Sequence, residues 1–256
     1  MELPLDVSQC MEALEGASFA TYAVGGCVRD HVLGLAPHDF DLCSAATPEQ
    51  LQAVFRHRQL VLAGVKHGTV GVVTDDGVVE ITTFRTEGDY TDCRHPGWVR
   101  FVPTIEEDLA RRDFTVNAMA WSPIRGFADP FGGQNDLRDG ILRAVGEPEK
   151  RFQEDALRIL RGVRFAVKYR LTPDHATQQA MFSQAHLMDG LAQERIFDEL
   201  CKLLISVNAD ILLRFAPVIT QVIPELAPTV GFDQRSPYHV FDLYTHIVHV
   251  TANTPA

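Results

Sequence analysis

The hydrophobic pattern of this sequence changes near Pro148, and this change constrains the possible fold more than any other feature. Before it, short β-branched runs are separated by glycine and turn residues. The clearest case, residues 69–84 (TVGVVTDDGVVEITTF), places two such runs around Asp-Asp-Gly and predicts a β-hairpin. After it, residues 147–171 repeat apolar side chains at helical spacing behind a proline and several acidic residues, which predicts a long amphipathic helix.

These two patterns predict an α+β chain. We expect a mixed β-sheet with flanking helices over residues 1–147 and an all-helical section over residues 148–256. The polar segment 85–97, rich in turn residues, is expected to be a mobile loop. Further elements predicted in the first part are strands at 21–24, 39–44 and 115–122, a helix at 48–57 with a capping box at Thr47, and a turn cluster at 128–136.

The composition is typical of a globular cytoplasmic protein. Hydrophobic residues make up 46% and charged residues 22% of the sequence, both ordinary values. No run of 18 apolar residues predicts a transmembrane helix, and the first residues lack the pattern of a signal peptide. The five cysteines are scattered and never spaced CxxC, which argues against a disulfide framework or a zinc site. We therefore expect a cytoplasmic protein without membrane contact.

The net charge of −11 is unusual for a protein that binds nucleic acid, because phosphate contacts require Lys and Arg. Thirteen of the 23 Lys and Arg residues, however, lie between residues 100 and 170. A solvated helix face and a phosphate-binding surface both explain such a cluster. The charge distribution alone does not decide between them.

Asp39 and Asp41 form an acidic pair in the segment DFDLCS. On a strand, residues i and i+2 point to the same face, so the two carboxylates are expected to lie side by side. Mg²⁺ prefers carboxylates together with phosphate oxygens, and two ions about 3.5–4 Å apart can clamp an in-line displacement. The pair is therefore the predicted catalytic and metal site, with Mg²⁺ as cofactor. A solvated strand end is the alternative.

A glycine turn precedes the acidic pair. Gly25 and Gly26 follow a predicted strand and open a predicted helix, so the backbone can approach a phosphate closely and the helix start presents free N–H groups. Arg29 adds a fork-shaped donor set that suits a triphosphate. A tight turn without a ligand is the alternative. A phosphate-binding turn followed so soon by paired carboxylates favours nucleotide binding by Gly26 and Arg29.

Five segments of the sequence resemble, in order, the motifs of one family. They cover residues 20–206 and read GGCVRDHVLGLAPHDFDLCSAATPEQ, EEDLARRDFTVNAMAW, DPFGGQNDL, RFQEDALRILRGVRF and ERIFDELCKLL. The family is that of the class II tRNA nucleotidyltransferases and bacterial poly(A) polymerases, in the DNA polymerase beta superfamily. The resemblance implies a nucleotidyltransferase head followed by a helical neck and body. It also implies template-independent addition of CCA to the 3′ end of tRNA from CTP and ATP by two-metal chemistry.

The resemblance also assigns residues to the incoming nucleotide. Asp155 and Arg158 are three positions apart on the predicted helix and would lie on one face. In the family, the matching pair selects CTP and then ATP through the Watson–Crick edge of the base, so no nucleic-acid template is needed. A surface salt bridge is the alternative. Further residues assigned to phosphate, ribose or the nucleotide pocket are Arg112, Asp113, Arg161 and Arg164.

The sequence leaves the roles of three other polar residues open. Glu80, on a predicted strand, is either a third metal carboxylate or a structural partner, and it is not assigned to the site. Arg195 and Glu199 are four positions apart on a predicted helix, and we expect them to brace helices rather than contact substrate.

Rival activities within the family differ in two segments. Residues 64–69 (GVKHGT) resemble the GxxHGT form of CCA-adding enzymes, and the basic stretch of poly(A) polymerases is absent. Enzymes that add only CC typically have a shortened loop between the first two motifs, whereas residues 87–101 (EGDYTDCRHPGWVRF), which include most of the loop at 85–97, have full length. CCA addition is therefore favoured, with partial CC or A addition and poly(A) synthesis as alternatives. Because CTP and ATP differ in size, this loop is expected to move between the two additions.

The last segment, YHVFDLYTHIVHV, resembles the entry to an HD-type phosphohydrolase region, but no His-Asp pair follows it. Hydrolysis is therefore a function of a different class that would need a further C-terminal region. We expect the natural protein to continue beyond residue 256. The expected partners are the tRNA 3′ end, CTP and ATP, with no obligate protein partner.

Overall fold

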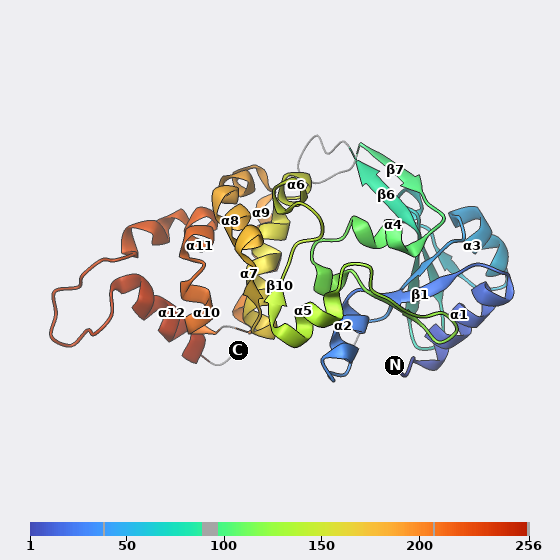
Figure 1. Ribbon diagram of the computed structural model, residues 1–256, viewed down its shortest axis with the longest axis horizontal. Coiled ribbons are helices and arrows are strands. Elements are labelled where there is room, and N and C mark those ends of the chain that lie inside the picture. Colours follow the sequence, from blue (N-terminus) through green and yellow to red (C-terminus); the bar gives the residue numbers. More distant parts are fainter. Residues whose placement is uncertain (38, 89–96, 207, 255–256) are drawn as a thin grey trace. The chain divides into compact units, whose positions relative to one another are not determined.

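The computed structural model describes residues 1–37, 39–88, 97–206 and 208–254. Contacts divide the chain into two compact units, the first made of the described residues up to Asp139 and the second of those from Gly140 onward (Figure 1). The sequence predicted a domain boundary at residue 147, a few residues after this division between Asp139 and Gly140. That this boundary also separates the functions of the two parts stays a prediction. In the ranges described, no helix is long and apolar enough to cross a membrane.

A seven-stranded mixed sheet forms the centre of the first unit, with the strand order β3-β4-β5-β2-β1-β8-β9. Its neighbouring strands are antiparallel except β2 and β5, which are parallel. The predicted hairpin at 69–84 is confirmed as β4 and β5, which pair from Thr69 with Thr82 to Val73 with Val78. The strands of this sheet are β1 (Thr21–Val24), β2 (Asp41–Ser44), β3 (Leu60–Val61), β4 (Thr69–Val73), β5 (Val78–Thr83), β8 (Ala120–Ser122) and β9 (Gly126–Ala128).

The segment predicted as a mobile loop at 85–97 begins as a strand. Two strands, β6 (Arg85–Gly88) and β7 (Trp98–Phe101), pair as an antiparallel ribbon. The rest of that predicted loop, residues 89–96, lies outside the described residues.

Five α-helices and two 3₁₀ turns accompany the sheet within the described part of the first unit. Helix α3 begins as predicted, because Thr47 accepts the N–H of Gln50 and the Gln50 side chain accepts the N–H of Thr47. It ends at Val54, three residues earlier than expected. These elements are α1 (Leu5–Gly16), α2 (Gly26–Val32), α3 (Pro48–Val54), η1 (Val65–His67), α4 (Ile105–Ala110), η2 (Thr115–Asn117) and α5 (Gly133–Asp139).

The strand predicted at 115–122 is wrong in its first half. Residues 115–117 form the 3₁₀ turn η2, and only 120–122 form β8. The Asp113 side chain accepts hydrogen bonds from the N–H of Phe114 and from Asn117. Such local side-chain bonds favour a turn over an extended strand.

The second unit is mainly helical. Its one sheet within the described residues is the short parallel pair of β10 (Ile141–Leu142) and β11 (Thr172–Pro173), so the expectation of an all-helical section is wrong at this point. The helices are α6 (Pro148–Glu154), α7 (Leu157–Tyr169), α8 (His175–Ser183), η3 (Ala185–Gly190), α9 (Gln193–Leu204), α10 (Ala209–Leu213), α11 (Ala216–Val222), η4 (Pro224–Thr229) and α12 (Leu243–Asn253).

The single long helix predicted after Pro148 is wrong, because it is two helices. Helix α6 ends at Glu154 and α7 begins at Leu157. Asp155 between them is extended, with φ −146° and ψ 104°, and its carboxylate accepts the N–H of Leu157 at 3.1 Å. The side chain thus satisfies a free N–H group at the start of α7. The predicted apolar stripe of α7 is buried as expected, and this helix packs against α9.

Candidate functional site

Asp39 and Asp41 lie at the start of β2. Asp41 is the first residue of the strand and pairs with Val24, the last residue of β1. Asp39 precedes the strand because β1 offers no partner beyond Val24, so the prediction that one strand carries both carboxylates is wrong for Asp39. Both residues are exposed, and both line a cleft of about 600 Å³ whose other acidic residues are Asp6, Asp76 and Glu80.

Glu80 reaches this cleft from β5. Because Leu42 lies beside Ile81 in the parallel pair of β2 and β5, the preceding residues Asp41 and Glu80 are neighbours on the same face of the sheet. Across the described ranges, however, no three His, Cys, Asp or Glu side chains are grouped so that they could hold a metal ion. The candidate metal ligands are therefore Asp39 and Asp41, and the role of Glu80 is not decided by its position.

The charge around this pair fits a divalent cation. Neither carboxylate forms a hydrogen bond or an ion pair in the part of the chain described. Partial loss of water contact raises the pKa of Asp41, the charge of Arg112 lowers it, and the nearby Asp39 carboxylate raises it again. A carboxylate whose charge is disfavoured by a neighbouring carboxylate is stabilised when a cation binds beside it. Their oxygen atoms are also the ligands that Mg²⁺ prefers.

The glycine turn lies beside the acidic pair, as predicted. Gly25 joins β1 to α2 with φ 72°, and its N–H donates to the carbonyl of Met119 at 3.1 Å. A β-carbon at Gly25 would lie 2.8 Å from Nη1 of Arg112. Glycine therefore provides both the backbone angle and the space for this guanidinium. Gly26 is the first residue of α2, where helix N–H groups lack helical partners.

Arg29 and Asp113, both predicted to contact the nucleotide, belong to one hydrogen-bonded chain. The Arg29 side chain is buried and donates to Asp30 at 2.7 and 2.9 Å and to Oδ1 of Asn117 at 2.6 Å. Asn117 donates in turn to Asp113 at 3.1 Å. Asn117 was not among the predicted site residues, although its spacing of four residues from Asp113 suits a turn bond. These contacts connect α2 with η2 and fix both predicted residues.

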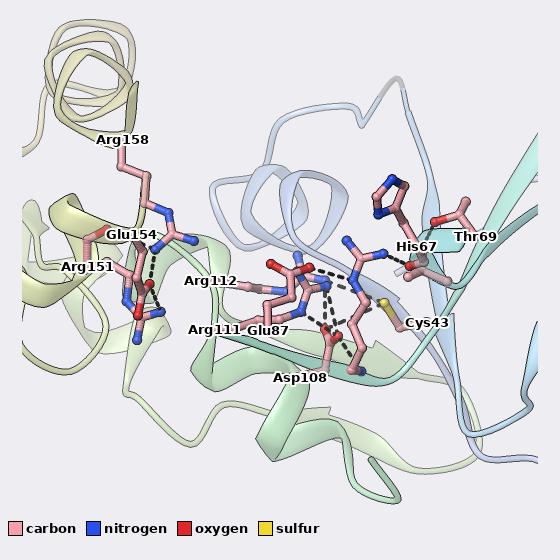
Figure 2. A network of polar contacts seen from close by, with 12 residues as sticks. Cys43, His67, Thr69, Glu87, Asp108, Arg111, Arg112, Arg151, Glu154 and Arg158 are labelled. Atoms are coloured by element: carbon pink, nitrogen blue, oxygen red, sulfur yellow. Dashed lines mark hydrogen bonds and ion pairs between the residues drawn. The ribbon is translucent and has the colours of Figure 1, made fainter. Parts of the chain in front are cut away.

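Arg112 follows α4 and lies against the glycine turn. Its Nη2 donates to Oδ2 of Asp108 at 3.3 Å and to Sγ of Cys43 at 3.6 Å. Figure 2 shows this group, in which Arg111 donates to the other carboxylate oxygen of Asp108. Asp108 was missed by the sequence analysis. Its signal was the spacing of three and four residues to Arg111 and Arg112, which suits ion pairs on a helix.

Asp155 and Arg158 do not lie together on one helix face, which corrects the prediction. Asp155 precedes α7 and accepts two hydrogen bonds from Nη2 of Arg195, at 2.9 and 3.2 Å. Arg158 lies in α7 and donates to Glu154 at 2.6 Å and to the carbonyl of Arg151 at 3.1 Å (Figure 2). Because of the break between α6 and α7, Asp155 precedes the helix that carries Arg158, and the two side chains bond to different partners.

Arg161 and Arg164 continue along α7 as expected. Their guanidinium groups lie over the ring of Phe165, at 5.3 and 4.3 Å from its centroid. Arg164 also donates to the buried carboxylate of Glu199 on α9. Arg195 and Glu199 of α9 thus brace the residues predicted to bind nucleotide, in agreement with the role expected from their spacing.

Two family models match the chain. The Poly A polymerase head domain matches residues 21–143, and the probable RNA and SrmB-binding site of polymerase A matches residues 170–229.

Curated relatives and solved structures extend this likeness. The CCA-adding enzyme of Ligilactobacillus salivarius is 46% identical over 198 residues, which cover 77% of this chain and 48% of the relative. That of Streptococcus uberis is 46% identical over 211 residues, covering 81% and 52%. The crystal structure of the Bacillus stearothermophilus CCA-adding enzyme in complex with CTP is 36% identical, with a TM-score of 0.75 over 98% of this chain and 58% of that one. The chain spans about half the length of the curated relatives it matches.

Proposed function

The chain belongs to the family of tRNA nucleotidyltransferases and poly(A) polymerases, and on this premise we propose that it adds CCA to the 3′ end of tRNA, using CTP and ATP. The observation that carries the proposal is the pair Asp39 and Asp41. These carboxylates are exposed at the start of β2, next to the glycine turn, and form no ion pair with a described residue. The proposed substrate places the reaction in the cytoplasm.

Asp39 and Asp41 would hold Mg²⁺ through their carboxylate oxygens. The bound metal would lower the pKa of the tRNA 3′-hydroxyl group and neutralise charge on the triphosphate. The 3′-hydroxyl group would lose its proton to water and its oxygen would attack the α-phosphorus of CTP or ATP. The bond from the α-phosphorus to the bridging oxygen would break, and pyrophosphate would leave with that oxygen. Glu80, one of the other acidic residues of the cleft and a neighbour of Asp41 on the sheet, is a candidate for further support of the metal.

The first unit would bind the triphosphate with groups around the glycine turn. Gly26 offers first-turn N–H groups of α2, and Arg112 offers a guanidinium beside Gly25. Arg29 and Asp113 are bonded to each other through Asn117, which suits them to shape this turn and the ribose contact.

In the second unit, Asp155 and Arg158 would select the base. A carboxylate can accept from the amino group of cytosine or adenine, and a guanidinium can donate to the neighbouring ring nitrogen. The ion pairs with Arg195 and Glu154 give the two side chains defined directions before a nucleotide binds. Arg161 and Arg164 would complete the pocket. Partial CC or A addition and poly(A) synthesis are not favoured, because the relatives described above are named CCA-adding enzymes.

Incubation with a tRNA that ends at the discriminator base tests this function. With Mg²⁺ and CTP alone we expect two added nucleotides, and with CTP and ATP three, ending in A. Addition that stops at CC in the presence of ATP would assign partial activity, and a long A tail from ATP alone would assign poly(A) synthesis. No addition by the folded chain, with the Bacillus stearothermophilus enzyme active in parallel, would contradict the proposal.

A further inference from the structure

Asp108 on α4 is a fully buried carboxylate that joins three segments of the first unit. One oxygen accepts the N–H of Arg85 at 3.2 Å and Nε of Arg111 at 3.0 Å. The other accepts Nη2 of Arg112 at 3.3 Å and the thiol of Cys43 at 3.8 Å (Figure 2). Four donors therefore meet at one side chain, from β2, from the start of β6 and from the end of α4.

The charge of Asp108 is retained despite its burial. Burial alone would raise the pKa of this carboxyl group, but Arg111 and Arg112, together with the backbone N–H of Arg85, outweigh that effect and hold the pKa below its usual value. A buried carboxylate with such partners is a fixed anion, and it fixes the cations around it.

Arg112 is held by this anion at one end only. Its Nη2 bonds to Asp108 and Cys43, whereas its Nε is buried and has no hydrogen-bond partner in the described residues. Its Nη1 lies against the backbone of Gly25, where a β-carbon would come within 2.8 Å. Gly25 directly follows Val24, the strand partner of Asp41. The Nη1 group of Arg112, which Asp108 does not use, therefore lies at the glycine turn, beside the start of β2.

We propose that Asp108 is a positioning residue: it holds the Arg112 guanidinium so that its remaining donors bind the triphosphate of the incoming nucleotide at the glycine turn. This inference rests on the proposed function. An arginine chain has several rotatable bonds, and a guanidinium fixed at one edge loses less freedom when its other donors bind an anion. Asp108 itself does not touch the nucleotide.

A purely structural role for Asp108 makes a different prediction. The loss of a buried anion between two arginines then lowers the free energy of unfolding, and it affects every ligand of the folded protein to the same extent. A positioning role acts on phosphate binding alone. CTP and cytidine separate the two roles, because they share the base and ribose and differ in the triphosphate.

The test measures equilibrium binding of CTP with Mg²⁺, and of cytidine, to the wild-type chain and to Asp108→Asn by calorimetry without tRNA. We expect the Asp108→Asn variant to bind CTP about tenfold more weakly, as for the loss of one charge-assisted hydrogen bond, and to bind cytidine like the wild type. Glu15→Gln is the matched control. Glu15 also accepts two arginine nitrogens, from Arg125, and a backbone N–H, from Thr21, but none of its partners is Arg112.

A double-mutant cycle connects the effect to Arg112. If Asp108 acts through Arg112, then Arg112→Lys alone weakens CTP binding, and adding Asp108→Asn causes no further loss. If Asp108→Asn does not fold, Asp108→Glu keeps the charge but displaces it by one methylene, and it must show the same loss confined to CTP.

The possible results distinguish the positioning role of Asp108 from the proposed function. Wild-type affinity for CTP in the folded Asp108 variant, or an equal loss for CTP and cytidine, overturns the positioning role and leaves the proposed function intact. A wild-type chain that binds no CTP contradicts the proposed function itself, and the positioning role with it.

Discussion

The acidic side chains predicted to bind metal and those predicted to read the base differ in their ion pairing. In the first unit, Asp39 and Asp41 form no ion pair with a described residue. In the second unit, Asp155 is paired with Arg195, and Arg158 is paired with Glu154. A carboxylate that binds a metal cation needs a negative charge that no ion pair neutralises. A side chain that recognises a base needs a fixed orientation instead. The absence of ion pairs therefore suits Asp39 and Asp41 to metal binding, and their presence suits Asp155 and Arg158 to base recognition.

The largest expected effect comes from Asp41→Asn, which removes charge from the unpaired group. The loss of several kcal/mol of metal-dependent stabilisation corresponds to a fall of about 10³-fold or more in the rate of nucleotide addition. The measurement is the initial rate at saturating Mg²⁺, with thermal unfolding as a check on the fold. Asp75→Asn, on the exposed turn between β4 and β5, is the control and should retain the rate. Near-normal turnover of Asp41→Asn would show that nucleotide addition does not need the charge of this unpaired carboxylate.

The next effect concerns the paired group, Asp155. Asp155→Ala removes the acceptor for the amino group of cytosine, and uracil presents a carbonyl oxygen at that position. Selectivity for CTP over UTP should fall by about 1–3 kcal/mol, with a smaller change in the rate with CTP. The values of kcat/KM for both nucleotides measure this, and Asp198→Ala, exposed on α9, serves as control. Unchanged selectivity would mean that the pair of Asp155 with Arg195 is only structural.

A smaller effect should follow from changing the partner instead of the acceptor. Arg195→Met leaves the Asp155 carboxylate in place but removes the cation that orients it. We expect a loss of about 1 kcal/mol in CTP-over-UTP selectivity, the size of one partly exposed ion pair. Lys202→Met on the same helix should have no such effect. If Arg195→Met lowers the rate with CTP and UTP alike, α9 supports the whole unit rather than the direction of Asp155.

The smallest effect on nucleotide addition is expected from a variant that changes only the stability of the first unit. Thr47→Ala removes the side-chain cap of α3 and should lower the free energy of unfolding by about 1 kcal/mol, without a change in nucleotide addition. Thr104→Ala is the matched control, because Thr104 stands at the N-cap of α4 but makes no capping bond to the backbone. Urea unfolding measures both variants. A loss of activity in Thr47→Ala would show that the first unit's stability and its unpaired carboxylates are not independent.

The features that the sequence predicted correctly are those that depend on neighbouring residues. The hairpin of β4 and β5, the capping box at Thr47 and the glycine turn at Gly25 follow from local backbone preferences. The strand that carries Asp41 was predicted in the same way, but it begins at Asp41, two residues later than predicted, so Asp39 precedes it.

The features that the sequence missed depend on partners far along the chain. Asp155 interrupts the predicted helix, and its carboxylate bonds to Arg195, 40 residues away. Helical periodicity continues across the break, so it gives no sign of it. Asp108 meets Cys43 and Arg85 only because the sheet brings β2 and the start of β6 next to α4. A pairing of this kind cannot be deduced from spacing alone.

The strand order of the sheet also has a consequence for how the protein is made. The N–H of Gly25 bonds to the carbonyl of Met119, and β1 is flanked by β2 on one side and β8 on the other. Contacts between residues so far apart form late, because a long loop must close first. During synthesis from the N-terminus, the ribosome must therefore release the first 122 residues before the turn beside Asp41 can be completed. A nascent chain that stalls earlier carries both aspartates but lacks the strand that completes their surroundings.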